Sequence, residues 1–488
     1  MTRLCKRITA VLCSALGALG ASAQSTMPGA ASVGGNSPGV QLRLRQSSVQ
    51  NETLGSVPIG TVNPQPISLS LADAIERGLR QNLALLVSDD AQLSAHGQLW
   101  EARSPLLPNV SAKVNENALK VNLAAEGFSK VTSLFPNFPL LIGPFAYFDA
   151  RVAFSQTLMD LHLLANERSA QQNAAAVKLS YQDMREVVVL AVGAAYLQSI
   201  AAGARVDTAD AEVQTAQALY NQAGDMKTVG VAANIDVLRA QVELQSRRQQ
   251  LIAARSDLAK QKLALARMIG LPLGQEFTLT EKIPYEAPQP LTVEEELQEA
   301  LKNRADFQAS LSQVHAAEQS LRAATAEHLP SVSIYADYGE IGPTISSVRG
   351  TFTTFAALQI PIFTGNRAHG DAQVAQAQLN RNRQEADNLR AQIEQDVRDA
   401  LLDLQAAADQ VTVAMSNSDL AQQTLTQSQD RFASGATDNI EVIQAQEAVA
   451  SANESYISSL YAFNLARVEL ARATGSAESG FRQYWKEK

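Results

Sequence analysis

The sequence has 488 residues, of which 46% are apolar and 18% charged, and it carries a formal net charge of −9. Its mean hydropathy is −0.10, which excludes a polytopic helical membrane protein, and its acidic balance argues against nucleic acid as the partner. Aromatic residues make up only 5% of the chain. This composition favours long helices packed through small side chains over a thick globular core.

The N-terminus has the layout of a cleavable secretory signal. A basic start at residues 3–7 precedes an apolar stretch at residues 8–20, and small residues follow as far as Ala23. The pattern predicts that residues 1–23 form a signal peptide cleaved after Ala23. The mature protein is therefore expected to be exported.

Both cysteines, Cys5 and Cys13, lie inside this predicted signal peptide. The mature chain is then free of cysteine, which excludes disulfides, thiol catalysis and thiolate metal sites together. Residues 24–66 follow, and they are rich in Gly, Ser, Pro and Asn without an apolar period. We expect these residues to form a flexible leader.

The remainder of the chain contains two similar copies of one sequence. An offset of 222 residues carries Leu107-Pro108 onto Leu329-Pro330, and further along an offset of 205 pairs Gly230 with Gly435. Unrelated helices rich in Ala and Gln would not keep this registration without gaps, so we infer an internal duplication.

Each copy opens with a Ser or Thr three residues ahead of an acid, at Ser70 and Thr292, a pattern typical of a capping-box helix start. The predicted divisions are a first repeat, a linker, a second repeat and a C-terminal tail, at residues 67–281, 282–290, 291–476 and 477–488.

Long stretches without proline predict a helical hairpin in each repeat. No proline lies between Pro144 and Pro272 or after Pro361, and proline costs roughly 3 kcal/mol inside a helix. The predicted hairpins cover about 160–270 and about 366–475. The chain is expected to reverse direction at Gly230 in the first hairpin and at Gly435 in the second.

The longest uncharged run, Val187 to Ala204, is near the minimum length for a helix that crosses a bilayer. Its counterpart in the second repeat, residues 392–409, contains six charged residues. Each charge at a membrane centre costs about 2.5–3.5 kcal/mol. Because two copies of one helix should lie in equivalent environments, we expect a buried seam between helices rather than a transmembrane helix.

Four segments ahead of the hairpins show the alternation of β-strands, at about 108–118, 145–158, 330–339 and 351–363. Their length suits strands that cross a membrane. Four strands cannot close a barrel and open edges cannot face lipid, so several copies must contribute strands, eight from a dimer or twelve from a trimer. The two offsets differ by 17, and we expect the 17 extra residues in the loop of the first strand pair.

Several short segments occur in the same order in both repeats. They are the Leu-Pro before the first strand, SQTLMD (155–160) against IPIFTG (360–365), the hairpin tips (229–241 and 434–446), and the closings ALARMIG and ELARATG. With these segments the chain resembles the outer membrane efflux protein family, the TolC-like channels, from about Ile67 to Gly475.

The resemblance implies an α+β membrane protein that works as a homotrimer. Four transmembrane strands per chain would complete a 12-stranded β-barrel in the outer membrane, and the helical hairpins would form a long periplasmic α-barrel. Such a channel passes substrates outward from a periplasmic adaptor and an inner membrane transporter, and it is in contact with outer membrane lipid. It needs no cofactor.

The resemblance also points to two sites. Acidic residues narrow the periplasmic entrance in the family, and the matching positions here are Glu441 and Gln444, so one expected carboxylate is missing. Glu441 would form an acidic ring that favours cations, whereas a solvated helix face is the alternative for a lone glutamate. The adaptor is expected to dock on the hairpin tips, at Val229, Gly230, Val231, Ser434, Gly435 and Ala436.

Two other classes of function agree less well with the sequence. The five histidines show no metal-ligand spacing, and no phosphate loop, nucleotide fingerprint or nucleophile elbow is present, so the sequence predicts neither an enzyme nor a metal site. The stronger alternative is a soluble periplasmic coiled-coil scaffold or adaptor without a pore.

Overall fold

The computed structural model describes residues 55–128, 138–230, 233–281, 285–287, 291–437 and 439–484. The predicted signal peptide, most of the predicted leader and linker, and Val231 of the first tip lie outside the described residues. Their predicted roles stay predictions.

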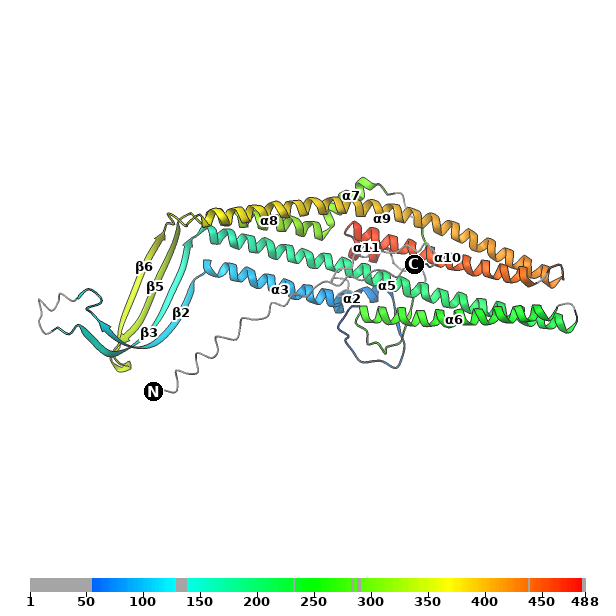
Figure 1. The fold of residues 1–488 in the computed structure, drawn as a ribbon, viewed down its shortest axis with the longest axis horizontal. Helices are drawn as coiled ribbons and strands as arrows, with labels where there is room; N and C mark the ends of the chain where they lie inside the picture. The colour runs from blue at the N-terminus through cyan, green and yellow to red at the C-terminus, as the bar shows by residue number, and fades with distance from the viewer. Residues whose placement is uncertain are drawn as a thin grey trace, which may run out of the picture. The chain divides into compact units, whose positions relative to one another are not determined.

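The two repeats have the same succession of elements, which Figure 1 shows in chain order. The first repeat contains α2 (Leu71–Gln81), α3 (Leu83–Arg103), η1 (Ser104–Leu106), β2 (Asn109–Asn122), β3 (Leu141–Met159), α5 (Leu161–Thr228) and α6 (Asn234–Met268). The second contains α7 (Val293–Asn303), α8 (Ala305–Ala326), β5 (Ser331–Gly342), η3 (Ile345–Ser347), β6 (Arg349–Gln359), α9 (Arg367–Ala433) and α10 (Asn439–Ala473). A short helix, α11 (Ala477–Tyr484), follows.

The helix starts of the two repeats differ in one respect from the sequence prediction. Ser70 caps α2 and forms a full capping box with Asp73. Thr292 also precedes its helix, but its hydroxyl donates to the Glu295 carboxylate at 2.5 Å and makes no cap to the backbone. The predicted capping box is therefore wrong at Thr292: the Ser70 hydroxyl both donates to the Asp73 carboxylate and accepts from the Asp73 N–H, whereas the Thr292 hydroxyl makes only the bond to the carboxylate.

Four strands form one antiparallel sheet in the order β2-β3-β5-β6, so the central pairing of β3 with β5 joins the two repeats. The first strand pair is longer than the second, with 14 and 19 residues against 12 and 11. The connection between the strands is also longer in the first repeat, residues 123–140 against 343–348, as the sequence predicted, so the extra residues lengthen both the loop and the strands.

The helices continue the order of the strands. α3 contacts α5, α5 contacts α8, and α8 contacts α9. Figure 1 shows the strands at one end of these helices and the two hairpin tips at the other. The edges of the sheet, β2 and β6, therefore lead to the outermost helices of the row, α3 and α9.

The uncharged run in α5 lies in the core. Val188, Val192 and Tyr196 are fully buried and pack with α2, α6 and the short parallel pair β1 (Ile67–Leu69) and β4 (Phe277–Leu279). α5 is long and apolar enough to span a membrane, but 56% of its most apolar window is buried inside the protein. Its counterpart in α9 buries Ile393 and Val397 in the same way. The predicted buried seam is confirmed.

Candidate functional site: a two-faced sheet and two hairpin tips

One face of the four-stranded sheet is largely apolar and exposed. The register places Val110, Phe154 and Ala336 in one row across β2, β3 and β5. The large apolar side chains of this face that are at least half exposed are Val110, Val114, Val152, Tyr338, Phe352 and Leu358. Exposed apolar side chains in such numbers on one sheet face fit contact with lipid.

The other face carries a charged cluster. Arg151 on β3 donates to Asp149 at 2.9 Å and, across the strands, to Asp337 on β5 at 2.9 Å. Asp337 is 7% exposed, and Lys113 lies opposite Arg151 on β2. Because Arg151 links the strands at which the two repeats meet, this cluster stabilises their junction and makes the face polar.

Within the described residues neither β2 nor β6 has a second strand partner. A row of free backbone N–H and C=O groups cannot face hydrocarbon, since each unsatisfied group costs several kcal/mol there. A single chain with one apolar face is therefore incomplete as a membrane structure.

The first hairpin tip lies between α5 and α6. Val229 ends α5 and is 73% exposed, and Gly230 follows with φ +81 and donates its N–H to the Lys227 carbonyl. A Cβ on Gly230 would meet nothing within 4 Å. The glycine is required here by its left-handed conformation and not by space.

The second tip, between α9 and α10, uses the same turn. Gly435 has φ +72 and donates to the Phe432 carbonyl, while Ala436 donates to the Arg431 carbonyl. These two bonds make a Schellman motif, and Ser434 is the C-cap residue before it. The predicted tip residues that the structure describes are therefore at the turns, and Ser434, Gly435 and Ala436 are exposed.

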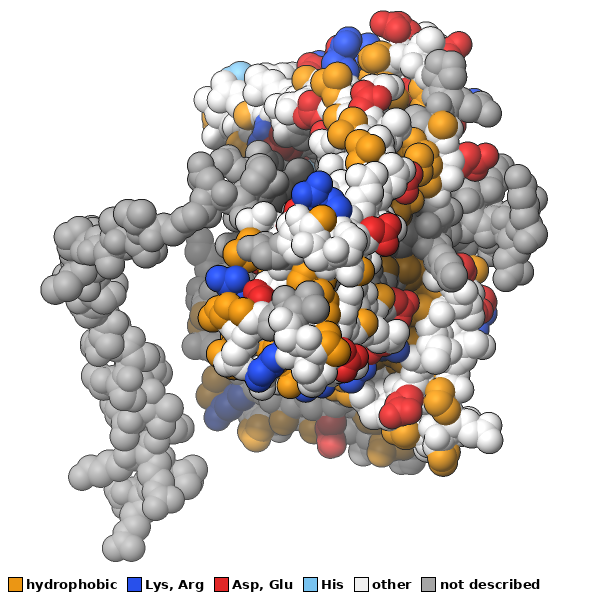
Figure 2. All heavy atoms as spheres, turned by 90° about the vertical axis from the view of Figure 1, so that its right-hand side faces the viewer, with side chains coloured by type: hydrophobic (Ala, Val, Ile, Leu, Met, Phe, Trp, Pro, Cys, Tyr) orange, Lys and Arg blue, Asp and Glu red, His pale blue; other side chains and the backbone are white. Residues whose placement is uncertain are grey.

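The two tips contact each other. Leu219 of α5, Ala240 of α6, Phe432 of α9 and Val442 of α10 share one buried cluster, and the Asn439 amide donates to the Asp236 carbonyl at 2.7 Å. Figure 2 views this end and shows apolar, acidic and basic side chains mixed over it. The tips thus form one surface of mixed chemistry.

Glu441, predicted to line the entrance, is held by its own hairpin. Its carboxylate accepts from Thr437 at 2.6 Å and from Ser428 at 3.4 Å, and it pairs with Arg431 of α9 at 3.2 Å. The Glu441 side chain is 38% exposed, and Gln444 is exposed. Arg431 was not predicted from the sequence; it lies ten residues away across the turn and offsets the charge of Glu441.

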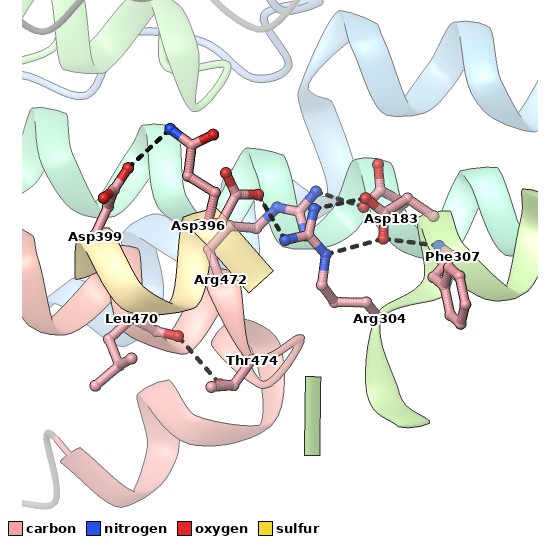
Figure 3. Close-up of polar contacts among 10 residues, drawn as sticks. Asp183, Arg304, Phe307, Asp396, Asp399, Leu470, Arg472 and Thr474 are labelled. Atoms are coloured by element: carbon pink, nitrogen blue, oxygen red, sulfur yellow. Dashed lines mark hydrogen bonds and ion pairs between the residues drawn. The ribbon is translucent and has the colours of Figure 1, made fainter. Parts of the chain in front are cut away.

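A second charged cluster joins the repeats in the middle of the helices (Figure 3). Arg304, at the start of α8, pairs with Asp306 at 2.7 Å and with Asp396 of α9 at 2.8 Å. Arg472 of α10 pairs with Asp183 of α5 at 2.5 Å. The Arg472–Asp183 pair connects the two repeats, whereas the pairs of Arg304 lie within the second repeat.

Burial sets the protonation of the acids in this cluster. It raises the pKa of Asp183 above the usual value, against the charge of Arg472. Burial also acts to raise the pKa of Asp306, but the hydrogen bonds and charge of Arg304 outweigh it and leave that pKa below the usual value. The Asp306–Arg304 pair is therefore firmly ionised.

The geometry is that of a membrane protein of the outer membrane type. Its sheet has one face suited to lipid and one polar face, and long helical hairpins continue from the strands. Among the residues that the structure describes, no group of three or more His, Cys, Asp or Glu side chains could hold a metal ion.

The chain matches the family Outer membrane efflux protein over residues 74–271 and 297–476, and it belongs to this family. It is an outer membrane efflux channel and not an enzyme. This membership sets aside the alternative of a soluble scaffold or adaptor.

Curated relatives and solved structures agree. The chain is similar to the probable efflux pump outer membrane protein TtgC of Pseudomonas putida, with 23% identity over 417 residues and 83% of each chain covered. Its fold is similar to the outer membrane channel CmeC of Campylobacter jejuni, with TM-score 0.73, 15% identity, and 89% and 95% of the two chains covered. VceC of Vibrio cholerae matches with TM-score 0.71, 20% identity, and 83% and 96% covered.

Proposed function

We propose that three copies of this chain assemble into one channel, with a twelve-stranded barrel in the outer membrane and the helical hairpins forming a periplasmic tube below it. The observation that carries the proposal is the four-stranded sheet with one exposed apolar face and two unpaired edges. Eight strands enclose little more than packed side chains, whereas twelve leave a lumen, which favours three copies over two.

The strand directions allow this closure. Each neighbouring pair in β2-β3-β5-β6 is antiparallel, so β2 and β6 run in opposite directions. β6 of one copy can therefore pair with β2 of the next in the antiparallel manner of outer membrane barrels. The face that carries Arg151 and Asp337 would then line the lumen.

The experiment is fractionation followed by gel electrophoresis. The mature chain should be found in outer membranes as a detergent-resistant oligomer of three chains that conducts ions in planar bilayers. A freely soluble monomer without conductance would contradict the proposal.

The tips are proposed to dock a periplasmic adaptor, which would connect the channel to an inner membrane transporter. The exposed turns at Gly230 and Gly435 support this proposal, because they are the parts of the chain most distant from the sheet. Gly435→Trp should abolish efflux and adaptor cross-linking without changing the oligomer. Gly127→Trp is the matched control, since Gly127 also has positive φ and open space but lies in the β2–β3 loop. Efflux that survives Gly435→Trp would refute docking there.

Glu441 is proposed to form an acidic ring at the periplasmic entrance, with its strength reduced by Arg431. The ion pair between them supports a specific comparison. Glu441→Ala should lower the permeability of the channel to cations relative to anions, and Arg431→Ala should raise it. If both variants keep the selectivity of the parent channel in planar bilayers, Glu441 does not line the conduit.

A further inference from the structure

The connection between β6 and α9 exposes an apolar pair that no described part of the chain covers. Ile362 is 95% exposed and Phe363 is 83% exposed. Gly365 and Asn366, shortly after this pair, have φ +66 and +64, and this left-handed turn leads the chain into α9. Two large apolar side chains left this open are expected to meet another surface.

The corresponding connection in the first repeat is built differently. There β3 continues to Met159, paired with Val332 of β5, and Asp160 caps α5 directly. β6 ends earlier, at Gln359, and Pro361 then offers no N–H for pairing. The exposed pair therefore belongs to the outer edge of the sheet, beyond which the described residues contribute no further strand.

The opposite edge carries a second exposed apolar group at the same boundary between strands and helices. Leu107, just before β2, is 47% exposed, and Trp100, near the end of α3, is 54% exposed. β2 begins at this boundary and β6 ends at it. When β6 of one copy lies beside β2 of the next, these two apolar groups fall at the same level.

We propose that Ile362 and Phe363 of one copy pack against Leu107 and Trp100 of the next copy, sealing the junction between subunits where the barrel meets the helices. The inference rests on the proposed multi-chain assembly and names the contact that closes it. The occupant is a second copy because both apolar groups lie at sheet edges that must pair with another chain.

Cysteine pairs test the contact directly, because both native cysteines lie in the predicted signal peptide. Within one chain, Leu107 and Ile362 lie at opposite edges, three strand spacings or roughly 14 Å apart. A disulfide needs Cα atoms within about 7 Å, so only neighbouring copies can form it. In outer membranes of the full chain, Leu107→Cys with Ile362→Cys should give covalently linked chains up to the full oligomer after oxidation.

The matched control is Leu158→Cys with Ile362→Cys. Leu158 lies near the end of β3 at the same boundary and is 55% exposed, but β5 separates it from β6 of its own chain and β2 separates it from the next copy. This pair should link no chains. A second measurement is thermal dissociation of the oligomer. Phe363→Ser should lower its midpoint, whereas Ile345→Ser, which removes a side chain that is 74% exposed in the β5–β6 loop, should not.

The outcomes separate this inference from the proposed assembly. An oligomer of normal mass in which Leu107→Cys and Ile362→Cys do not link would overturn the contact and leave the assembly in place. A parent protein that is monomeric would overturn both the contact and the assembly. Strong quenching by brominated phospholipid of a thiol-linked fluorophore on the single variant Ile362→Cys would show that the pair faces lipid, and would also overturn the contact.

Discussion

The leading helix of each repeat breaks at an equivalent residue, and the two breaks use different chemistry. Asn82 separates α2 from α3 with φ −67 and ψ 134, and Arg304 separates α7 from α8 with φ −63 and ψ 116. The Asn82 side chain accepts from Ala84 at 3.0 Å and donates to the Met268 carbonyl at 3.3 Å. Arg304 makes no cap and is held by the carboxylates of Asp306 and Asp396 instead.

The side chains around the two breaks differ in the same way, uncharged in the first repeat and charged in the second. Where the second repeat has Asp306 and Asp396, the first has Ala84 and Ala191. The first repeat is thus stabilised here by apolar packing and one amide cap, and the second by ion pairs that reach across helices. The comparison teaches that one backbone geometry can be specified by two unrelated sets of side chains, provided that every buried charge keeps its partner.

The largest effect is expected at the ion pairs of the second repeat. Arg304 is 5% exposed, and Arg304→Ala would leave the half-buried Asp306 carboxylate without the cation that it is hydrogen-bonded to, which should cost about 3 kcal/mol of stability. Thermal unfolding followed by circular dichroism in detergent measures it. Arg381→Ala, which removes an exposed pair with Glu385 on α9, is the control and should change nothing. Equal midpoints for the two variants would show that the second repeat does not depend on its charges.

The next effect concerns a glycine that both repeats retain. Gly270 and Gly475 end α6 and α10 with φ +72 and +71 and pack against the two breaks. A Cβ on Gly475 would meet the Arg304 backbone nitrogen at 2.8 Å, so Gly475→Ala should cost about 2 kcal/mol through strain and close contact. Gly435→Ala has the same φ but open space, and should cost only about 1 kcal/mol. The reverse ranking would contradict this packing.

A smaller effect is expected at the cap of the first repeat. Asn82→Ala removes the side chain that caps α3 and should cost about 1 kcal/mol, while Asn82→Ser keeps an acceptor and should recover most of it. The same unfolding measurement applies. If Asn82→Ala destabilises as much as Arg304→Ala, the contrast between an amide cap and an ion network fails.

The smallest effect is a dependence on pH. Burial, with a contribution from Asp403, raises the pKa of Glu469 above its ordinary 4.5, so ionised Glu469 destabilises the fold as the pH rises through that raised value. Glu469→Gln should therefore raise the unfolding midpoint near neutral pH. This gain should vanish below the ordinary pKa, where the glutamate is protonated in both states. A gain that persists unchanged in acid would point to a cause other than ionisation.

Much of the fold could be predicted because it depends on local sequence patterns. Long proline-free stretches predicted α5, α6, α9 and α10, paired glycines predicted both turns, and alternation predicted four strands. The parallel pair of β1 with β4 could not be predicted, since each strand has three residues and the partners are far apart in sequence. The order β2-β3-β5-β6 also depends on contacts between the repeats that no local pattern encodes.

Some features of the candidate sites could be predicted from the sequence and others could not. Gly230 and Gly435 could be placed at the tips because their positive φ follows from the residue type and the registration of the repeats. The ion pair of Glu441 with Arg431 could not, because it depends on how α9 and α10 face each other across the turn. The two faces of the sheet follow from alternation, but the Arg151–Asp337 bond needed the pairing of β3 with β5.

The mass of the detergent-solubilised particle, measured by light scattering with the detergent subtracted, tests the central claim most directly. A four-stranded sheet with two open edges predicts three chains per particle, which together supply twelve strands. A stable particle that contains one chain would contradict the account, because a single sheet with an uncovered apolar face and two unpaired edges would then be complete.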